Sequence, residues 1–122
     1  MHELISGQIF VFGSNLQGIH GAGAALYALK HCGALWGVGE GIQGQSYAIP
    51  TCSAPGIPLL LDEVNQHVKT FIKYALDHPQ EEFFVTAIGT GYAGFKHKQI
   101  APMFADAPSN CILPPEWKGI KS

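Results

Sequence analysis

The stretch Ile9-Phe10-Val11-Phe12-Gly13-Ser14-Asn15 decides the fold. Its first four residues form a continuous apolar run, which predicts a strand buried on both faces, as in α/β sheets. Gly13-Ser14-Asn15 then gives a turn signal, and a glycine-punctuated loop extends to Gly23. The alanine-rich segment that follows predicts a short helix ending near Cys32-Gly33.

The same strand, loop and helix order recurs along the chain. Apolar residues at helical spacing predict an amphipathic helix over 60–77, with His78-Pro79 closing it. The apolar run 83–88 predicts a second buried strand, and a short helix is expected over about 97–105. We expect shorter strands at 34–38, at 46–49 (stopped by Pro50) and at 110–113. The segments 39–44 and 52–58 are expected to be a loop and a surface connection. These elements predict one α/β domain over residues 1–122, with a mixed, largely parallel sheet.

The amino-acid composition argues against nucleic-acid binding, a disulfide-rich fold and membrane association. The chain has 122 residues, is 47% hydrophobic and 13% charged, and carries a formal net charge of −2. All of its cations are lysines, so we expect no binding to a nucleic-acid backbone. Three widely spaced cysteines argue against a disulfide framework, and no segment resembles a signal peptide or a membrane span. The expected location is the cytoplasm, without membrane association.

Glycines gather where the two apolar strands end. If these strands are parallel, the loops Gly13–Gly23 and Gly89–Gly94 share one edge of the sheet, where ligands bind in such folds. Glycine lets backbone amides turn toward a ligand, and amides at a helix start hold an anion without arginine. This pattern favours a backbone-held diphosphate. The alternative is that the glycines only make tight turns. Neither P-loop nor zinc-ligand spacing occurs, and we expect no metal and no cofactor.

Asn15 and His20 are the polar residues with the clearest candidate chemistry. An amide after a buried strand can bond a ribose hydroxyl, and a histidine in the same loop can act as general acid or base. The alternatives are a turn-forming Asn15 and a loop histidine with no partner. Tyr92 and Phe95 are candidates to flank a sugar or stack on a base, or else they close the core.

Four segments in order resemble the macro domain superfamily, the ADP-ribose-binding α/β/α modules. Val11–Asn15 (VFGSN) and His20–Leu26 (HGAGAAL) look like that family's strand, asparagine and glycine loop leading into a helix. Tyr47–Thr51 (YAIPT) looks like its short strand ending in proline, and Phe84–Phe95 (FVTAIGTGYAGF) like its second glycine loop. The resemblance spans roughly 9–104 and is strongest to small stand-alone macro-like proteins of bacteria and phages. It implies a three-layer α/β/α sandwich.

The resemblance also implies a ligand and its contacts. Asn15 would contact the distal ribose, and the loop amides would hold the diphosphate. The residues expected to bind the ligand are Gly13, Ser14, Asn15, Gly21, Ala22, Gly23 and Ala24 from the first loop, and Gly89, Thr90, Gly91, Tyr92, Ala93, Gly94 and Phe95 from the second. The acidic residue that hydrolytic members carry after the glycines is alanine here, at Ala24 and Ala25.

These observations lead to three hypotheses. The first is a macro-like domain that binds ADP-ribose or a related nucleotide and hydrolyses an ADP-ribosyl or phosphoester bond by metal-independent water attack. In that hypothesis His20 is the general acid or base, and Asn15 positions the ribose or the water. The second is a nucleotide sensor with the same pocket and no turnover. The third is an interaction protein whose glycine loops are structural only.

Overall fold

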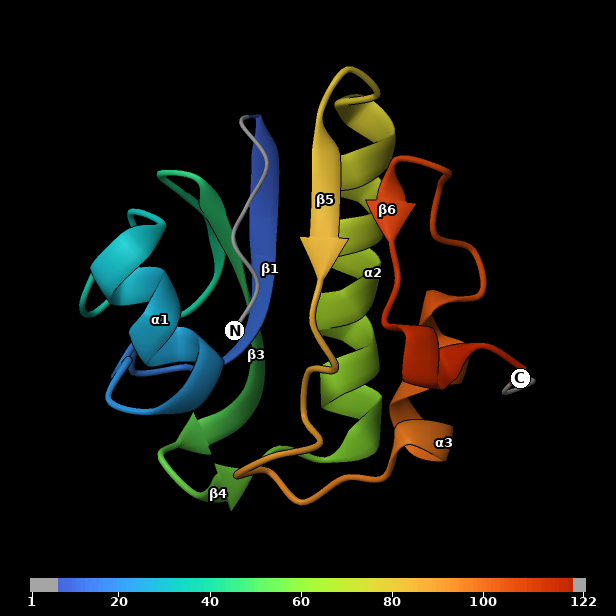
Figure 1. Ribbon diagram of the computed structural model, residues 1–122. Coiled ribbons are helices and arrows are strands. Elements are labelled where there is room, and N and C mark those ends of the chain that lie inside the picture. Colours follow the sequence, from blue (N-terminus) through green and yellow to red (C-terminus); the bar gives the residue numbers. More distant parts are fainter. Residues whose placement is uncertain (1–6, 120–122) are drawn as a thin grey trace.

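A mixed, largely parallel sheet of six strands forms the centre of the molecule (Figure 1). The computed structural model describes residues 7–119. The strand order is β2-β3-β1-β5-β6, and β4 pairs with β3. The mutually parallel strands are β1 (Gln8–Asn15), β3 (Ser46–Ala54), β5 (Glu82–Val85) and β6 (Cys111–Ile112). The antiparallel strands β2 (Gly41–Gln43) and β4 (Ile57–Pro58) both pair with β3.

The central strand β1 supplies side chains to two separate cores. Ile9 and Val11 pack into a core with helix α2 (Leu61–Asp77), which runs behind β5 in Figure 1. Phe10 and Phe12 pack into a second core with helix α1 (Gly23–His31). Because side chains alternate along a strand, α1 and α2 cover opposite faces of the sheet. The continuous apolar run therefore makes a strand buried on both sides, as predicted.

The amphipathic helix predicted over 60–77 is confirmed. In α2 the apolar stripe faces the sheet and is buried through Val64, Val68, Phe71, Ile72 and Ala75. Asp62 and Glu63 lie in the first turn, where negative charge interacts favourably with the helix dipole. The predicted helix over 97–105 divides into α3 (His97–Ile100) and a 3-10 turn, η1 (Ala101–Phe104), with Pro102 at the start of that turn. A second 3-10 turn, η2 (Pro115–Trp117), follows β6.

The prediction that β3 stops at Pro50 is wrong. The strand continues to Ala54, and its pairing with β1 shifts immediately after Pro50, so that Asn15 faces Cys52. A β-bulge tolerates the missing N–H of proline because the ladder is already interrupted there. The expected surface connection at 52–58 is instead the end of β3 and a tight hairpin into β4.

The prediction of a strand at 34–38 and a loop at 39–44 is also wrong. Residues 35–38 form one turn, closed by a hydrogen bond from the Val38 N–H to the Leu35 carbonyl oxygen, and Leu35 and Trp36 are exposed; β2 lies at 41–43, where it pairs with β3. The apolar residues at 34–38 gave a strand signal, yet no neighbouring strand is available to pair with them. β5 ends at Val85, three residues before the predicted end of that strand. No helix within residues 7–119 has the length and hydropathy needed to cross a membrane.

Buried Tyr47 makes the stability of the protein decrease as the pH rises in the alkaline range. Its ring lies in β3 against Phe71 and Tyr74 on α2, with centroid distances of 5.0 and 5.2 Å. Burial raises the pKa of the Tyr47 phenol from 10.0 to about 12, and the charge of Glu40 adds to the rise. As the pH rises above 10, the unfolded chain ionises Tyr47 while the folded protein keeps its proton.

We therefore expect the free energy of unfolding to fall as the pH rises from 10 toward 12. Urea unfolding at a series of alkaline pH values measures this fall, with Tyr47→Phe as the control. Other groups titrate in the same range, among them Cys111, whose pKa burial raises to about 11. Wild type and Tyr47→Phe share those groups, so the difference between the two slopes belongs to Tyr47. Equal slopes would contradict the prediction.

Candidate functional site

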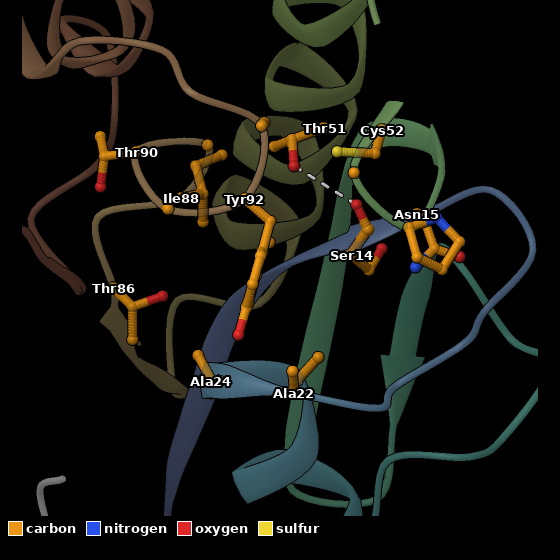
Figure 2. Close-up of a pocket in the computed structure, with 18 of the residues that line it drawn as sticks. Ser14, Asn15, Ala22, Ala24, Thr51, Cys52, Thr86, Ile88, Thr90 and Tyr92 are labelled. Atoms are coloured by element: carbon orange, nitrogen blue, oxygen red, sulfur yellow. Dashed lines mark hydrogen bonds between the residues drawn. The ribbon is translucent and has the colours of Figure 1, made fainter. Parts of the chain in front are cut away.

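A pocket of about 520 Å³ lies at the carboxyl ends of β1, β3 and β5 (Figure 2). Parallel strands place their carboxyl ends at one edge of the sheet, and ligands of α/β folds bind there. The end of β1, the start of α1, the β3–β4 hairpin and the loop after β5 form its walls. Twelve of the residues predicted to bind a ligand line it: Gly13, Ser14, Asn15, Gly21, Ala22, Gly23, Ala24, Gly89, Thr90, Gly91, Tyr92 and Ala93.

The start of α1 presents free backbone amides to the pocket. The first hydrogen bond of this helix runs from the Leu26 N–H to the Ala22 carbonyl oxygen, at 3.2 Å. Within residues 7–119, the N–H groups of Gly23, Ala24 and Ala25 have no acceptor. No side chain caps this end, and the first turn contains no acidic residue. The uncapped end therefore carries the partial positive charge of the helix dipole into the pocket.

The loop after β5 faces α1 from the other side and also offers amides. The Phe95 N–H donates to the Gly89 carbonyl oxygen at 2.9 Å, and the Gly94 N–H donates to that of Gly91 at 3.0 Å. These two bonds close the loop around residues 91–93. The amides of residues 91–93 have no acceptor in the part of the chain that the structure describes. Successive free amides in a turn form a concave anion-binding surface.

Gly13 and Gly89 allow the two strand ends to approach each other at the pocket floor. A Cβ atom on Gly13 would lie 3.3 Å from the Gly89 nitrogen. Gly89 has φ +75°, and a Cβ atom there would lie 3.3 Å from both Phe95 and Ile100. A side chain at Gly13 would therefore press on the second loop, and one at Gly89 would press on the core side chains packed against that loop.

The serine and threonine hydroxyl groups in the wall have their protons committed to the protein. Ser14 donates to the Gly39 carbonyl oxygen, and Thr51 donates to that of Ser14 at 3.3 Å. Thr86 and Thr90 donate to the carbonyl oxygens of Val11 and Ala87, at 2.7 and 2.8 Å. A carbonyl oxygen only accepts, so these four hydroxyl oxygens have lone pairs, but no proton, to offer a ligand.

Asn15 lies in the pocket wall and also folds the loop that follows it. Its Nδ2 donates to the Ile19 carbonyl oxygen at 3.0 Å, and its Oδ1 accepts from the Ile19 N–H at 3.1 Å. The side chain is 7% exposed. One amide proton and one lone pair remain beyond these two bonds. The turn-forming role and the predicted ligand contact are therefore compatible.

His20 lies outside the pocket wall. Its side chain is fully buried, with the ring edge-on against Phe12 at a centroid distance of 5.3 Å. Its Nε2 lies 3.1 Å from the Val38 carbonyl oxygen. An acid or base must reach the reacting group of the ligand, so this position does not support the predicted acid–base role. His20 and Asn15 also bond different residues: His20 contacts the Val38 carbonyl oxygen, whereas Asn15 bonds the backbone of Ile19.

Gly94 and Phe95 are likewise not part of the pocket wall. The Phe95 ring lies beneath Gly89, and its N–H closes the second loop. Phe95 therefore supports the loop from the core side. Because it does not line the pocket, the structure does not support its predicted contact with the ligand. Tyr92, at 72% exposure, lies over the pocket mouth near Ala24 (Figure 2).

Part of the pocket wall, above all the part formed by β3 and its hairpin, was not predicted from the sequence. Nine further residues line the pocket: Ile19, Ala25, Thr51, Cys52, Pro55, Gly56, Thr86, Ala87 and Ile88. Thr51 and Cys52 lie near the carboxyl end of an apolar strand, as Asn15 does, and this position is typical of ligand-binding residues. Because the sequence predicts that this strand ends at Pro50, it does not identify the two residues as candidates.

The pocket wall carries no charged side chain among the residues that the structure describes, and Cys52 and Tyr92 are its only titratable groups. No three side chains of the metal-ligating types His, Cys, Asp and Glu come together anywhere in residues 7–119. The site is thus an uncharged pocket with two facing sets of free amides. No protein-family model, no curated protein and no solved structure matches this chain.

Proposed function

We propose that the protein binds ADP-ribose or a closely related nucleotide, and that its fold is the three-layer, macro-like α/β/α sandwich. One observation carries this proposal: residues 23–25 at the start of α1 and residues 91–93 line the same pocket, and their amides have no acceptor within residues 7–119. A helix start leaves its first amides without an intrahelical partner, and an anion bound there satisfies them and interacts favourably with the helix dipole.

Two amide sets suit a ligand with two linked anionic groups. In the proposed complex, one phosphate binds the amides of residues 23–25 and the next binds those of residues 91–93, so that a diphosphate bridges the two loops that line the pocket. The wall contains neither a cation to clamp a phosphate nor an acid to repel it. The diphosphate is then held by dipoles alone, as the absence of arginine from the sequence suggests.

The committed hydroxyl groups favour sugars at the ends of the ligand. Thr86 lies to one side of the start of α1, and Thr51 lies across the pocket from it, beside Cys52 (Figure 2). Both present only lone pairs to the pocket, so each accepts from a ligand group that carries a proton. Ribose hydroxyls and the amino group of adenine are such donors.

Binding, rather than hydrolysis, is the function that this geometry supports. His20 was the predicted acid or base, and it does not line the pocket. We therefore assign a nucleotide-binding role in which His20 is not an acid–base catalyst and Asn15 contacts the ligand. An ADP-ribosylated protein recovered intact after long incubation with this chain would support this assignment, and release of ADP-ribose from it would contradict the assignment.

Calorimetric titration with ADP-ribose tests the proposal, with ADP and AMP as controls. We expect micromolar binding of ADP-ribose, weaker binding of ADP, which lacks the second ribose, and the weakest binding of AMP, which lacks the diphosphate. No heat with any of the three would contradict the proposal. That result, together with a defined oligomer or a bound protein partner, would favour the interaction-protein hypothesis.

A further inference from the structure

We infer that His20 and Gln43 are positioning residues that hold the first anion-binding loop through one shared acceptor, the Val38 carbonyl oxygen. The inference rests on the proposed function, because it concerns the loop whose amides would bind the anion. It gives His20 a role other than acid–base catalysis, and it includes Gln43, which was not a candidate site residue in the sequence.

Two side-chain donors converge on the Val38 carbonyl oxygen. His20 Nε2 lies 3.1 Å from it, and Gln43 Nε2 donates to it at 3.0 Å. The two side chains are 0% and 3% exposed. A carbonyl oxygen has two lone pairs, so these donors fill its capacity. Loss of either donor leaves a polar group that water reaches poorly.

Gln43 also fixes the segment that carries this carbonyl. Its Oε1 accepts from the Leu35 N–H at 2.7 Å, while its Nε2 holds Val38. One side chain in β2 thereby holds both ends of the turn 35–38. Gln43 belongs to a strand paired with β3, so this turn is anchored to the sheet.

The turn 35–38 in turn holds the loop that follows β1. The Gly37 N–H donates to the Gly18 carbonyl oxygen at 2.8 Å, and His20 reaches Val38. Ser14, at the end of β1, donates to the Gly39 carbonyl oxygen. These three bonds attach the loop 14–20 (the end of β1 and the residues that follow it) to residues 37–39.

His20 is the last of these attachment points before the anion-binding amides begin. No amide of residues 21–25 donates to the protein within residues 7–119, so these amides do not fix their own positions. The segment is held at one end by His20 and at the other by α1. A displaced His20 would therefore move the amides that the ligand requires, even in a folded protein.

The hydrogen bond to Val38 also determines which nitrogen of the imidazole carries a proton. Because a carbonyl oxygen only accepts, Nε2 carries a proton. Nδ1 is buried and has no partner among residues 7–119. A glutamine side chain offers an N–H donor in about the place of Nε2 and has no titratable group. His20→Gln therefore separates positioning from acid–base chemistry, and His20→Leu removes both.

The experiment compares His20→Gln, His20→Leu and Gln43→Leu with wild type by calorimetry with ADP-ribose. Asn110→Leu is the matched control, because Asn110 donates to the carbonyl oxygens of Ala75 and His78 near the end of α2, away from the pocket. Hydrogen exchange of the peptide 15–26 is measured in parallel without ligand. We expect both leucine variants at 20 and 43 to bind about tenfold more weakly and to exchange faster in that peptide.

We expect His20→Gln to bind within about threefold of wild type and to restore slow exchange. Asn110→Leu should lower stability and leave both readouts unchanged. A His20→Gln variant as defective as His20→Leu in both readouts would overturn the inference, as would an equal loss of affinity in Asn110→Leu. If wild type does not bind ADP-ribose, the proposed function fails, whereas the exchange comparison still decides the positioning role.

Discussion

Replacing Gly18 with alanine is expected to destabilise the protein by about 3 kcal/mol or more. Gly18 has φ +68°, and a Cβ atom there would lie 2.3 Å from both the Gly37 carbonyl carbon and the Val38 nitrogen. The left-handed conformation alone costs a residue with a side chain about 1–2 kcal/mol. The contact costs more, because both atoms are backbone atoms and the turn 35–38 must move as a whole.

Gly37→Ala is the matched control for this prediction. Gly37 also has a positive φ, +89°, but a Cβ atom there would meet nothing within 4 Å. It tests backbone strain without the contact, so we expect a loss of about 1–2 kcal/mol. Urea unfolding of both variants provides the comparison. If the two variants lose equal stability, the loop 14–20 and the turn 35–38 are not in the close contact described here.

The close contact at Gly18 explains why the pocket depends on a segment outside its wall. The turn 35–38 lines no part of the pocket, yet it holds the loop from which the pocket amides begin. Gly18 permits the approach, and the Val38 carbonyl oxygen joins the two segments through His20. A substitution in the turn can therefore affect ligand binding without contacting the ligand.

The sequence predicted those elements whose signal is local. The apolar run at 9–12 and the stripe of α2 each reflect a single periodicity, and the structure confirms both. The prediction that the two glycine loops meet followed from the rule that parallel strands place their carboxyl ends at the same edge of the sheet. This rule needs only the strand directions, and the loops do meet at one pocket.

The predictions from sequence were wrong where the conformation of a segment depends on residues distant in the chain. Pro50 stays inside β3 because β1 lies beside it and a bulge absorbs the missing donor, which no local rule detects. Residues 34–38 are apolar but have no strand to pair with. His20 has the same neighbours in sequence whether it faces the pocket or Phe12. Only the position of Val38, which lies 18 residues away, decides between these orientations.

Substituting Ala22 with aspartate is expected to change stability and ligand binding in opposite directions. Ala22 is the N-cap residue of α1, with extended backbone (φ −159°, ψ 163°) and no capping hydrogen bond. A carboxylate there can accept from the free amides of Ala24 or Ala25. We expect this cap to stabilise the protein by about 1 kcal/mol. Thermal or urea unfolding measures the gain.

The same carboxylate would occupy the amides that the proposed function assigns to a phosphate, and it would repel that phosphate. Like charges about 4 Å apart near a protein surface repel by a few kcal/mol, so we expect ADP-ribose to bind at least about 100-fold more weakly. Ala22→Asn separates the two causes, because asparagine caps a helix as well as aspartate but carries no charge. We expect the asparagine variant to gain similar stability and to lose only about tenfold in affinity. Equal affinities of the aspartate and asparagine variants would mean that no anionic group lies at the start of α1. A more stable Ala22→Asp protein that no longer binds ADP-ribose would instead show that α1 is left uncapped for the ligand, at a cost in stability.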